Sequence, residues 1–238
     1  DPITAKRADS IITVSENSKR DIMKFLNVPE KKISVIYNGV DQKKFRRMNL
    51  EKAKPIFEKR GWPNDFLLYA GTIDHPGKNA MSVIKAFEHL KEMNEYSGNL
   101  ILAGMPGSGF EVVENYAKNS HWSKDIIFTG FVTDEELIAL YSTCKVFCFL
   151  SLYEGFGIPP LEALACGANV VVSNSSSLPE VVGEVGITVD PLNLDAITDA
   201  IERSLKNNGI NHEDEIKNHL NKYDWKILSS EFEKVFGK

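Results

Sequence analysis

The feature that most constrains this chain is an alternation that begins at Phe66. From there to the C-terminus, short apolar runs rich in β-branched and aromatic residues alternate with longer stretches of helical periodicity. The short runs show almost no polar alternation, which is typical of strands buried on both faces of a sheet. Alternating strands and helices build a parallel sheet covered by helices. The sequence therefore predicts an α/β fold with a Rossmann-like, doubly wound parallel sheet.

Six strands and seven helices are predicted in this region. The strands are Phe66–Ala70, Leu100–Ala103, Ile126–Thr129, Val146–Leu150, Val170–Ser173 and Ile187–Val189. The helices lie near Ala80–Met93, Phe110–Asn119, Asp134–Thr143, Pro160–Cys166, Asp195–Lys206, Glu213–Tyr223 and Trp225–Phe236. In the last helix, apolar residues recur at helical spacing and form one stripe, made of Trp225, Leu228, Phe232 and Val235.

Residues 1–60 differ in kind from the rest of the chain. The pattern predicts a strand at Ser10–Val14, a helix at Glu16–Leu26 with Ser15 as its N-cap, and a second strand at Ile33–Tyr37. A single strand–helix–strand piece cannot bury two faces of a sheet by itself. We therefore expect a division at about residue 60, with the first piece packed on the main domain or on a part outside this sequence.

The composition excludes several classes of protein. Among 238 residues, 28 are Lys or Arg and 33 are Asp or Glu, and the net charge of −5 argues against sequence-independent binding to nucleic acid or acidic lipid. The apolar runs are far shorter than the ~20 residues that span a bilayer. The three cysteines, Cys144, Cys148 and Cys166, lack the spacing of a disulfide framework or a zinc site. A cytoplasmic, reducing compartment is the simplest expectation.

The strongest candidate site is the stretch from Leu150 to Gly167, which is rich in Gly and Pro. A buried strand ends near Leu150 and a short helix begins near Pro160, so the turn lies at the carboxyl end of a strand, where open α/β sheets bind ligands. Glycines let a ligand approach the backbone, and free N–H groups at a helix start bind phosphate or sugar oxygens. Glu154 and Glu162, the latter in the first helical turn, are expected to face one crevice and accept hydrogen bonds from vicinal hydroxyls. For either glutamate alone, the alternative is a solvated side chain on an ordinary turn.

A second glycine-containing loop, residues 69–79, also leads from a strand to a helix. Its Gly-Lys pair suggests a P-loop, but five residues rather than four separate Gly71 from Gly77, and Asn79 lacks the hydroxyl that binds Mg²⁺ in that motif. We therefore reject the P-loop. Lys78 lies beside a helix N-terminus and is well placed to meet an anionic ligand. The alternative is a solvated lysine on a surface loop.

A third loop, residues 129–136, connects a strand to a helix. Thr133 is the expected N-cap of that helix and Glu136 completes a capping box, so both have a structural task. Phe131 and Val132 precede the cap. They could flank a planar base and offer it backbone hydrogen bonds.

Taken together, these segments resemble the retaining glycosyltransferases of family 4, the group 1 glycosyltransferases with the GT-B fold. The resemblance is to the C-terminal, nucleotide-sugar-binding domain, which is one half of a GT-B fold, and it runs from Phe66 to the end. Four blocks recur in order: residues 66–71 with Lys78, residues 100–104 together with 127–132, Glu154 and Glu162 at the spacing of the Glu-x7-Glu motif, and residues 178–182. Residues 5–45 resemble the stretch that leads into that domain.

The resemblance implies an enzyme, a hexosyl- or other glycosyltransferase of polysaccharide biosynthesis. It would move a sugar from a nucleoside diphosphate to a glycan or lipid-linked acceptor with retention. Glu154 would be catalytic, holding hydroxyls of the donor sugar and stabilising positive charge at its anomeric carbon. Glu162 would bind the ribose and Lys78 the diphosphate. The other implied donor-binding residues are Gly71, Thr72, Phe131, Val132, Phe156, Gly157 and Ile158. No metal and no cofactor is expected, because cations and helix N-termini neutralise the diphosphate in this fold class.

The chain departs from the family pattern in two ways. Thr72 stands where the family usually has a second phosphate-binding cation, an arginine, so His75 or a residue elsewhere is expected to substitute. The family's N-terminal acceptor domain has no counterpart except its closing segment. We therefore expect residues 1–60 to be that closing segment and a linker, and residues 61–238 to be the donor domain with C-terminal helices.

Three interpretations of function remain open at this point. The first is part of a longer two-domain enzyme, inactive alone, whose missing domain supplies the acceptor site and any peripheral contact with a membrane. The second is a sugar-nucleotide-binding subunit or sensor that acts with a separate acceptor-binding protein. A sugar-nucleotide epimerase of related fold is disfavoured by the Glu-x7-Glu spacing. The sequence does not choose between UDP and GDP, because backbone contacts to a base leave little trace in side chains.

Overall fold

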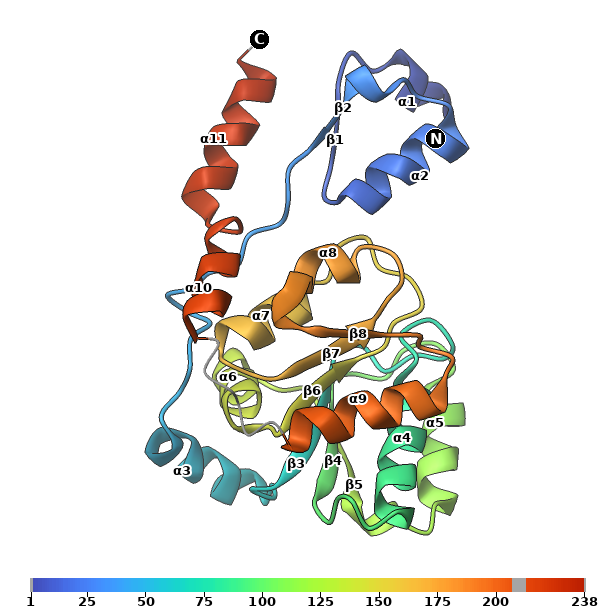
Figure 1. Ribbon diagram of the computed structural model, residues 1–238, viewed down its shortest axis with the longest axis vertical. Helices are drawn as coiled ribbons and strands as arrows, with labels where there is room; N and C mark the ends of the chain where they lie inside the picture. Colours follow the sequence, from blue (N-terminus) through green and yellow to red (C-terminus); the bar gives the residue numbers. More distant parts are fainter. Residues whose placement is uncertain (1, 207–212, 238) are drawn as a thin grey trace.

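The computed structural model describes residues 2–206 and 213–237, and its centre is a six-stranded parallel sheet (Figure 1). The strands lie in the order β5-β4-β3-β6-β7-β8, so the chain starts in the middle and builds outward in both directions. They are β3 (Phe66–Ala70), β4 (Asn99–Ala103), β5 (Ile126–Gly130), β6 (Val146–Phe149), β7 (Val170–Ser173) and β8 (Ile187–Val189). The predicted fold class is confirmed, and each of these six strands matches its predicted range to within one residue.

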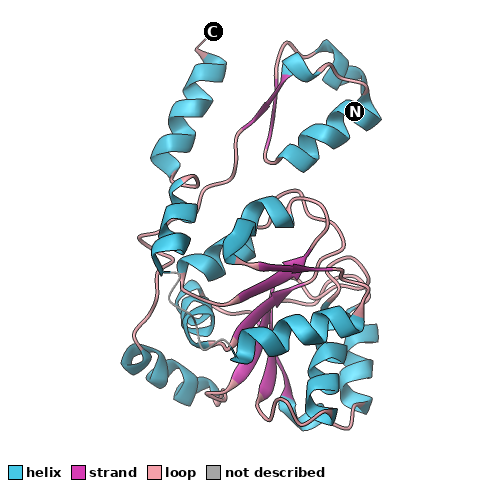
Figure 2. Ribbon diagram, viewed as in Figure 1, coloured by secondary structure: helices cyan, strands magenta, loops and turns pink. Residues whose placement is uncertain are grey.

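Helices cover both faces of this sheet (Figure 2). One face carries α4 (Ala80–Glu92), α5 (Phe110–Asn119) and α9 (Leu194–Lys206). The other carries α3 (Leu50–Arg60), α6 (Asp134–Thr143), α7 (Ile158–Ala165), α8 (Leu178–Val182) and α10 (Glu213–Asn221). Short 3-10 turns precede β5 at Ser123–Asp125 and β8 at Gly183–Val185. The core is therefore double, with one apolar layer on each side of the strands.

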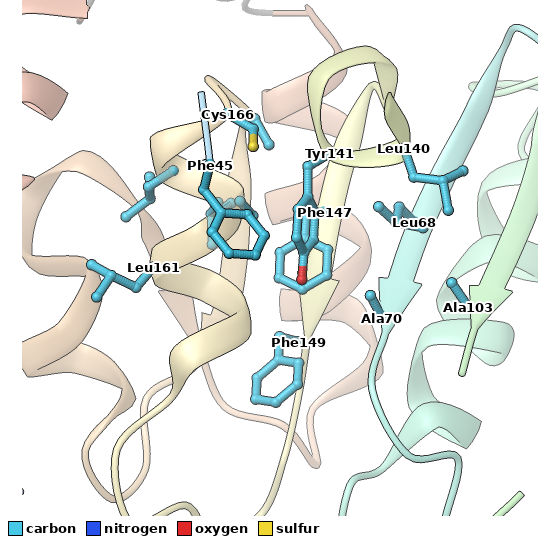
Figure 3. Packing of buried hydrophobic residues seen from close by; sticks show 14 of the residues in the cluster. Phe45, Leu68, Ala70, Ala103, Leu140, Tyr141, Phe147, Phe149, Leu161 and Cys166 are labelled. Carbon is cyan, nitrogen blue, oxygen red and sulfur yellow. The ribbon is translucent and has the colours of Figure 1, made fainter. Parts of the chain in front are cut away.

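Alternate residues of the central strands feed the two layers. Leu68 of β3 and Phe147 of β6 face the α6–α7 side, where the ring of Phe147 meets that of Tyr141 edge-on at 5.2 Å (Figure 3). Leu67 and Cys148 face the α4 side. All four strand residues are fully buried, which explains the lack of polar alternation in the sequence.

The helix α3 was not predicted from the sequence. It carries Pro55 in its interior, and proline normally ends a helix. Here the two ends of the helix and its packing stabilise it. Asn49 caps the N-terminus, and Gly61 ends the helix in a left-handed conformation. Ala53 and Phe57 bury one face of the helix. The short helices α1 (Pro2–Arg7) and α8 were also missed, because too few residues are present to show a period.

The first segment forms a separate small unit. Its strands β1 (Ile11–Thr13) and β2 (Ile33–Val35) pair in parallel, and α2 (Glu16–Leu26) connects them, with a 3-10 turn at Glu30–Lys32 before β2. The predicted helix and its Ser15 cap are confirmed, and both strands are shorter than predicted. The last helix, α11 (Trp225–Phe236), lies beside this unit rather than on the main sheet (Figure 1).

Candidate functional site

The candidate site is built where β3 and β6 end side by side at the centre of the sheet. The loops that follow them, residues 71–79 and 150–157, are joined directly. The N–H of Leu152 donates to the carbonyl of Gly77 at 2.9 Å. The buried side-chain amide of Asn79 donates to the carbonyls of Leu150 at 3.1 Å and Pro191 at 3.0 Å. Two loops far apart in sequence therefore form one surface at the carboxyl edge of the sheet.

Lys78 and Glu154 meet on this surface. Lys78 Nζ lies 2.7 Å from Glu154 Oε1, and the two side chains are 32% and 13% exposed. Each backbone is fixed: the N–H of Lys78 donates to the Asp74 carboxylate, and the N–H of Glu154 donates to the hydroxyl of Ser176. The structure thus brings together two of the predicted site residues as a cation and a carboxylate that remain open to solvent on one side.

The start of α7 supplies backbone donors next to Glu154. Gly157 has φ of +123°, and a Cβ there would lie 2.6 Å from the Leu178 side chain, so only glycine fits. Within the described part of the chain, the N–H groups of Phe156, Gly157 and Ile158 donate to no protein acceptor. Free N–H groups at a helix N-terminus favour a bound oxyanion. The side chain of Phe156 is buried against Tyr37, so only its backbone is available.

Glu162 lies deeper than the other two charged residues. It is the fifth residue of α7, so it stands in the second turn rather than in the predicted first turn. Its carboxyl group lies beside the buried phenol of Tyr141 on α6. Burial raises the pKa of Glu162 to about 7, against the opposing charge of Lys44. No hydrogen bond joins Glu162 to Lys78 or Glu154 within the described residues, so the predicted site divides into a solvent-facing pair and a half-buried carboxyl.

The turn after β5 exposes backbone groups in the same way. Gly130 has φ of +67°, Phe131 is 68% exposed, and Val132 packs partly on the core. The N–H groups of Phe131 and Val132 donate to no acceptor in residues 2–206 or 213–237. The predicted capping box of Thr133 and Glu136 is present and fixes the start of α6.

Gly71 and Thr72 complete the edge beside β4. The N–H of Gly71 donates to the carbonyl of Ala103 at 2.9 Å, and a Cβ on Gly104 would lie 1.9 Å from the carbonyl oxygen of Gly71. This close approach requires glycine at position 104, and the φ of +148° at Gly71 favours glycine there. Thr72 is exposed. The ring of His75 is half-buried, and its Nδ1 is buried without a partner in the described chain.

Sequence reasoning missed a contact between the first segment and the loop of Glu154. The carboxylate of Glu180 on α8 accepts from the N–H groups of Glu16 at 2.9 Å and Asn17 at 3.1 Å, at the first turn of α2. The hydroxyl of Ser18 donates to the carbonyl of Gly155, next to Glu154. We name these α2 contacts the α2 clamp. Sequence spacing could not reveal it, because its partners are more than 130 residues apart.

Two cavities lie away from this surface. One of about 770 Å³ is at the amino ends of the strands, where its walls include Asn64, Lys145 and Asn169. The other, of about 430 Å³, is an apolar groove between α11 and the β1–β2 pair, lined by Ile12 and Trp225 among others.

The described residues hold neither a cluster of metal-binding side chains nor a membrane-spanning helix. The part of the chain that the structure describes contains no group of three or more His, Cys, Asp or Glu side chains that could hold a metal ion. Among the helices of residues 2–206 and 213–237, none is long and apolar enough to cross a membrane.

Comparison with known proteins gives matches along most of the chain. The model of the family described as glycosyl transferases group 1 matches residues 52–223, and that of glycosyltransferase family 4 matches residues 2–44. The O-antigen chain mannosyltransferase B of Escherichia coli is 35% identical over 201 residues, which are 84% of this chain and 52% of the relative. The serotype-specific mannosyltransferase WbdA of the same species is 34% identical over 203 residues, which are 84% of this chain and 25% of the relative.

A solved structure, Anabaena Alr3699/HepE in complex with UDP and glucose, superimposes with a TM-score of 0.81 at 19% identity. The match covers 98% of this chain and 64% of that protein, and at this identity it shows the fold alone. The chain thus spans a quarter to about two thirds of the length of the proteins it matches.

Proposed function

Since this chain belongs to the group 1 glycosyl transferases, we propose that it binds a nucleoside diphosphate sugar and serves as the donor-binding part of an enzyme that transfers the sugar with retention. The observation that carries this proposal is the Lys78–Glu154 pair, 2.7 Å apart, beside the free N–H groups at the start of α7. A cation, a carboxylate and unpaired amides at one sheet edge match the three parts of such a donor's sugar diphosphate: anionic phosphates, hydroxyls and a departing oxyanion.

Binding of the donor would exchange partners at this pair. A diphosphate carries more negative charge than one carboxylate and would draw Lys78 toward itself. Glu154 is then free to accept hydrogen bonds from sugar hydroxyls and to face the positive charge that develops at the anomeric carbon. The N–H groups of Gly157 and Ile158 would meet the charge on the departing diphosphate. Preorganised donors of this kind lower the barrier because they need no reorientation during the reaction.

The donor sugar we propose is mannose. The two relatives at 34% and 35% identity are both named mannosyltransferases, and their similarity covers 84% of this chain. Guanine and uracil both remain candidates for the base, because the turn at Phe131 and Val132 offers backbone groups that can hydrogen-bond the edge of either.

Transfer itself is proposed to need a second part. The β1–β2 pair is a parallel sheet of two strands, and the groove of about 430 Å³ between it and α11 is lined by apolar side chains such as Trp225, which is 55% exposed. A further layer over these strands would bury them. We assign the acceptor site to that layer and expect negligible transfer by this chain alone. A separate acceptor-binding protein is the alternative source of the layer.

Ligand binding by this chain tests the proposal. GDP-mannose, UDP-glucose, UDP-galactose, GDP and UDP are screened by thermal shift and then by calorimetry. A ligand that binds only the folded form raises the melting temperature, and we expect a rise with at least one nucleotide sugar. Lys78→Ala should weaken the binding of a nucleoside diphosphate more than the binding of the corresponding nucleoside. Lys85→Ala, on the exposed side of α4, is the matched control and should bind like the wild type. Absence of any shift and any heat across the panel would overturn the proposal.

A further inference from the structure

Arg60, the last residue of α3, bridges the turn that follows β5. Its Nη2 donates to the carbonyls of Thr129 at 3.3 Å and Phe131 at 3.2 Å, and its Nε lies 3.4 Å from the Glu136 carboxylate. Thr129 belongs to the strand end, Phe131 to the turn and Glu136 to the first turn of α6. One guanidinium therefore ties together the parts on both sides of the free N–H groups of the turn.

The guanidinium is itself held in place. Its central carbon lies 4.8 Å from the ring centre of Trp62, which is only 8% exposed and packs edge-on against Phe57. Glu136 is fixed as well, because its other carboxylate oxygen accepts from the N–H of Thr133 at 2.8 Å. A planar group with five donors and a ring to stack on can hold several acceptors at defined angles, which a lysine cannot do.

The bonds from Arg60 decide which groups of the turn remain available. They occupy the carbonyls of Thr129 and Phe131, while the N–H groups of Phe131 and Val132 have no protein acceptor in the described chain. The Phe131 ring, 68% exposed, lies at the same turn. An exposed ring and free amides on a fixed backbone can stack on a planar base and hydrogen-bond its edge.

We propose that Arg60 is a positioning residue, which fixes the turn of residues 130–133 so that it receives the base of the donor nucleotide. This inference rests on the proposed function. It assigns Arg60 no contact with the reacting atoms, so its removal should act on recognition of the base and leave the diphosphate contacts of Lys78 in place.

The test compares nucleotide affinities of matched variants by calorimetry, with GDP and UDP as probes. We expect Arg60→Ala to lower the affinity for the better-bound nucleotide about tenfold. The affinities for GDP and UDP should therefore come closer together. Arg60→Lys keeps the charge but loses the fork of donors, and should recover only part of the loss. Lys59→Ala removes a neighbouring exposed cation of α3 and should match the wild type in both affinities.

A double variant separates positioning from a general loss of stability. If Arg60 acts through the turn, Phe131→Ala should abolish most of the effect of Arg60→Ala, because interacting residues are not additive. If Arg60→Ala bound GDP and UDP with the affinities of the wild type, and so with the same GDP-to-UDP ratio, the inference would be overturned while the proposed function stands. If Arg60→Ala does not fold, Arg60→Lys decides by the same ratio. Failure of the wild type to bind either nucleotide would instead overturn the proposed function and, with it, the inference.

Discussion

Two of the chain's strand–helix–strand units, β1-α2-β2 and β3-α4-β4, share the order of their elements and differ in what surrounds them. In the unit β3-α4-β4, all five residues of β3 are buried, and so is most of α4. In the unit β1-α2-β2, no residue of α2 is buried and only Thr13 of β1 is. Both units are parallel and both helices are amphipathic. The difference shows that such a unit gains a core only when further strands and helices cover it on both faces.

The two units are consequently held by different forces. Apolar packing dominates around β3, where the strands have helices on both sides. The β1-α2-β2 unit is joined to the main domain in part by polar contacts, among them the bonds of Glu180 to the first turn of α2, and in part by Tyr37 after β2, whose ring packs on Phe156. Each kind of joint can be broken separately, and the expected effects differ in size and in location.

The largest effect is expected from removing a ring of the main core. Phe147→Ala deletes a fully buried side chain that contacts Tyr141 and Phe149, and should lower the free energy of unfolding by about 3–5 kcal/mol. The matched change in the small unit, Ile12→Ala, removes a half-buried side chain and should cost about 1 kcal/mol. Urea unfolding measures both. Equal losses would contradict the contrast between a covered and an uncovered unit.

The same contrast explains how much of the fold could be predicted from the sequence. Strands such as Val170–Ser173 are buried on both faces, so every position before Ser173 is apolar and the run is visible without knowledge of its neighbours. The helix α3 has only Ala53 and Phe57 buried and contains Pro55, so local propensity argues against it and tertiary packing decides. Complete burial makes β7 visible in the sequence, whereas α3 depends on a few tertiary contacts that its local sequence does not show.

The candidate site divides in a similar way. The meeting of Lys78 and Glu154 follows from topology, because the carboxyl ends of neighbouring parallel strands lie together. The depth of Glu162 does not follow, since it depends on where the α6 helix places Tyr141. The contacts of Arg60 and Glu180 were also missed. Each joins segments 69 or more residues apart through side-chain geometry that leaves no periodic signal.

A second expected effect is a pH dependence that belongs to the covered domain. Burial raises the pKa of Glu162 to about 7, above the 4.5 of the unfolded chain, so between these values the folded state binds more protons. Stability should therefore fall as the pH rises from 5 to 8. Asp134 adds to the shift and Lys44 opposes it. Glu162→Gln keeps the size of the side chain and removes the charge, so it should gain about 1–2 kcal/mol over the wild type at pH 8 and little at pH 5.

The control for this titration lies in the small unit. Glu16→Gln removes an exposed carboxylate of α2 and should leave the pH dependence of the wild type unchanged. Urea unfolding at several pH values measures all three proteins. Because other groups titrate in the same range, the difference between Glu162→Gln and the wild type is the informative quantity. A constant difference from pH 5 to 8 would contradict the raised pKa.

The smallest expected effect comes from breaking the α2 clamp. Glu180→Ala removes the acceptor of two N–H groups at the start of α2, and the loss should be about 1 kcal/mol, mostly as local opening of that helix. Hydrogen exchange should speed up about fivefold to tenfold at the amides of Glu16 and Asn17, while the amides of β3 keep the rates of the wild type.

The position of the α2 clamp next to Glu154 makes this small effect informative. Ser18 donates to the carbonyl of Gly155, so a loosened α2 should also loosen the loop that carries Glu154. If the pair of Lys78 and Glu154 binds the sugar diphosphate, Glu180→Ala should lower the affinity for a nucleotide sugar more than the affinity for the free nucleoside diphosphate. The reason is that only the sugar meets Glu154. Glu180→Gln, which keeps a neutral acceptor, should fall between the alanine variant and the wild type. Unchanged exchange at residues 16 and 17 would show that β1–β2, rather than the carboxylate, holds α2. The small unit would then be joined to the main domain by packing after all.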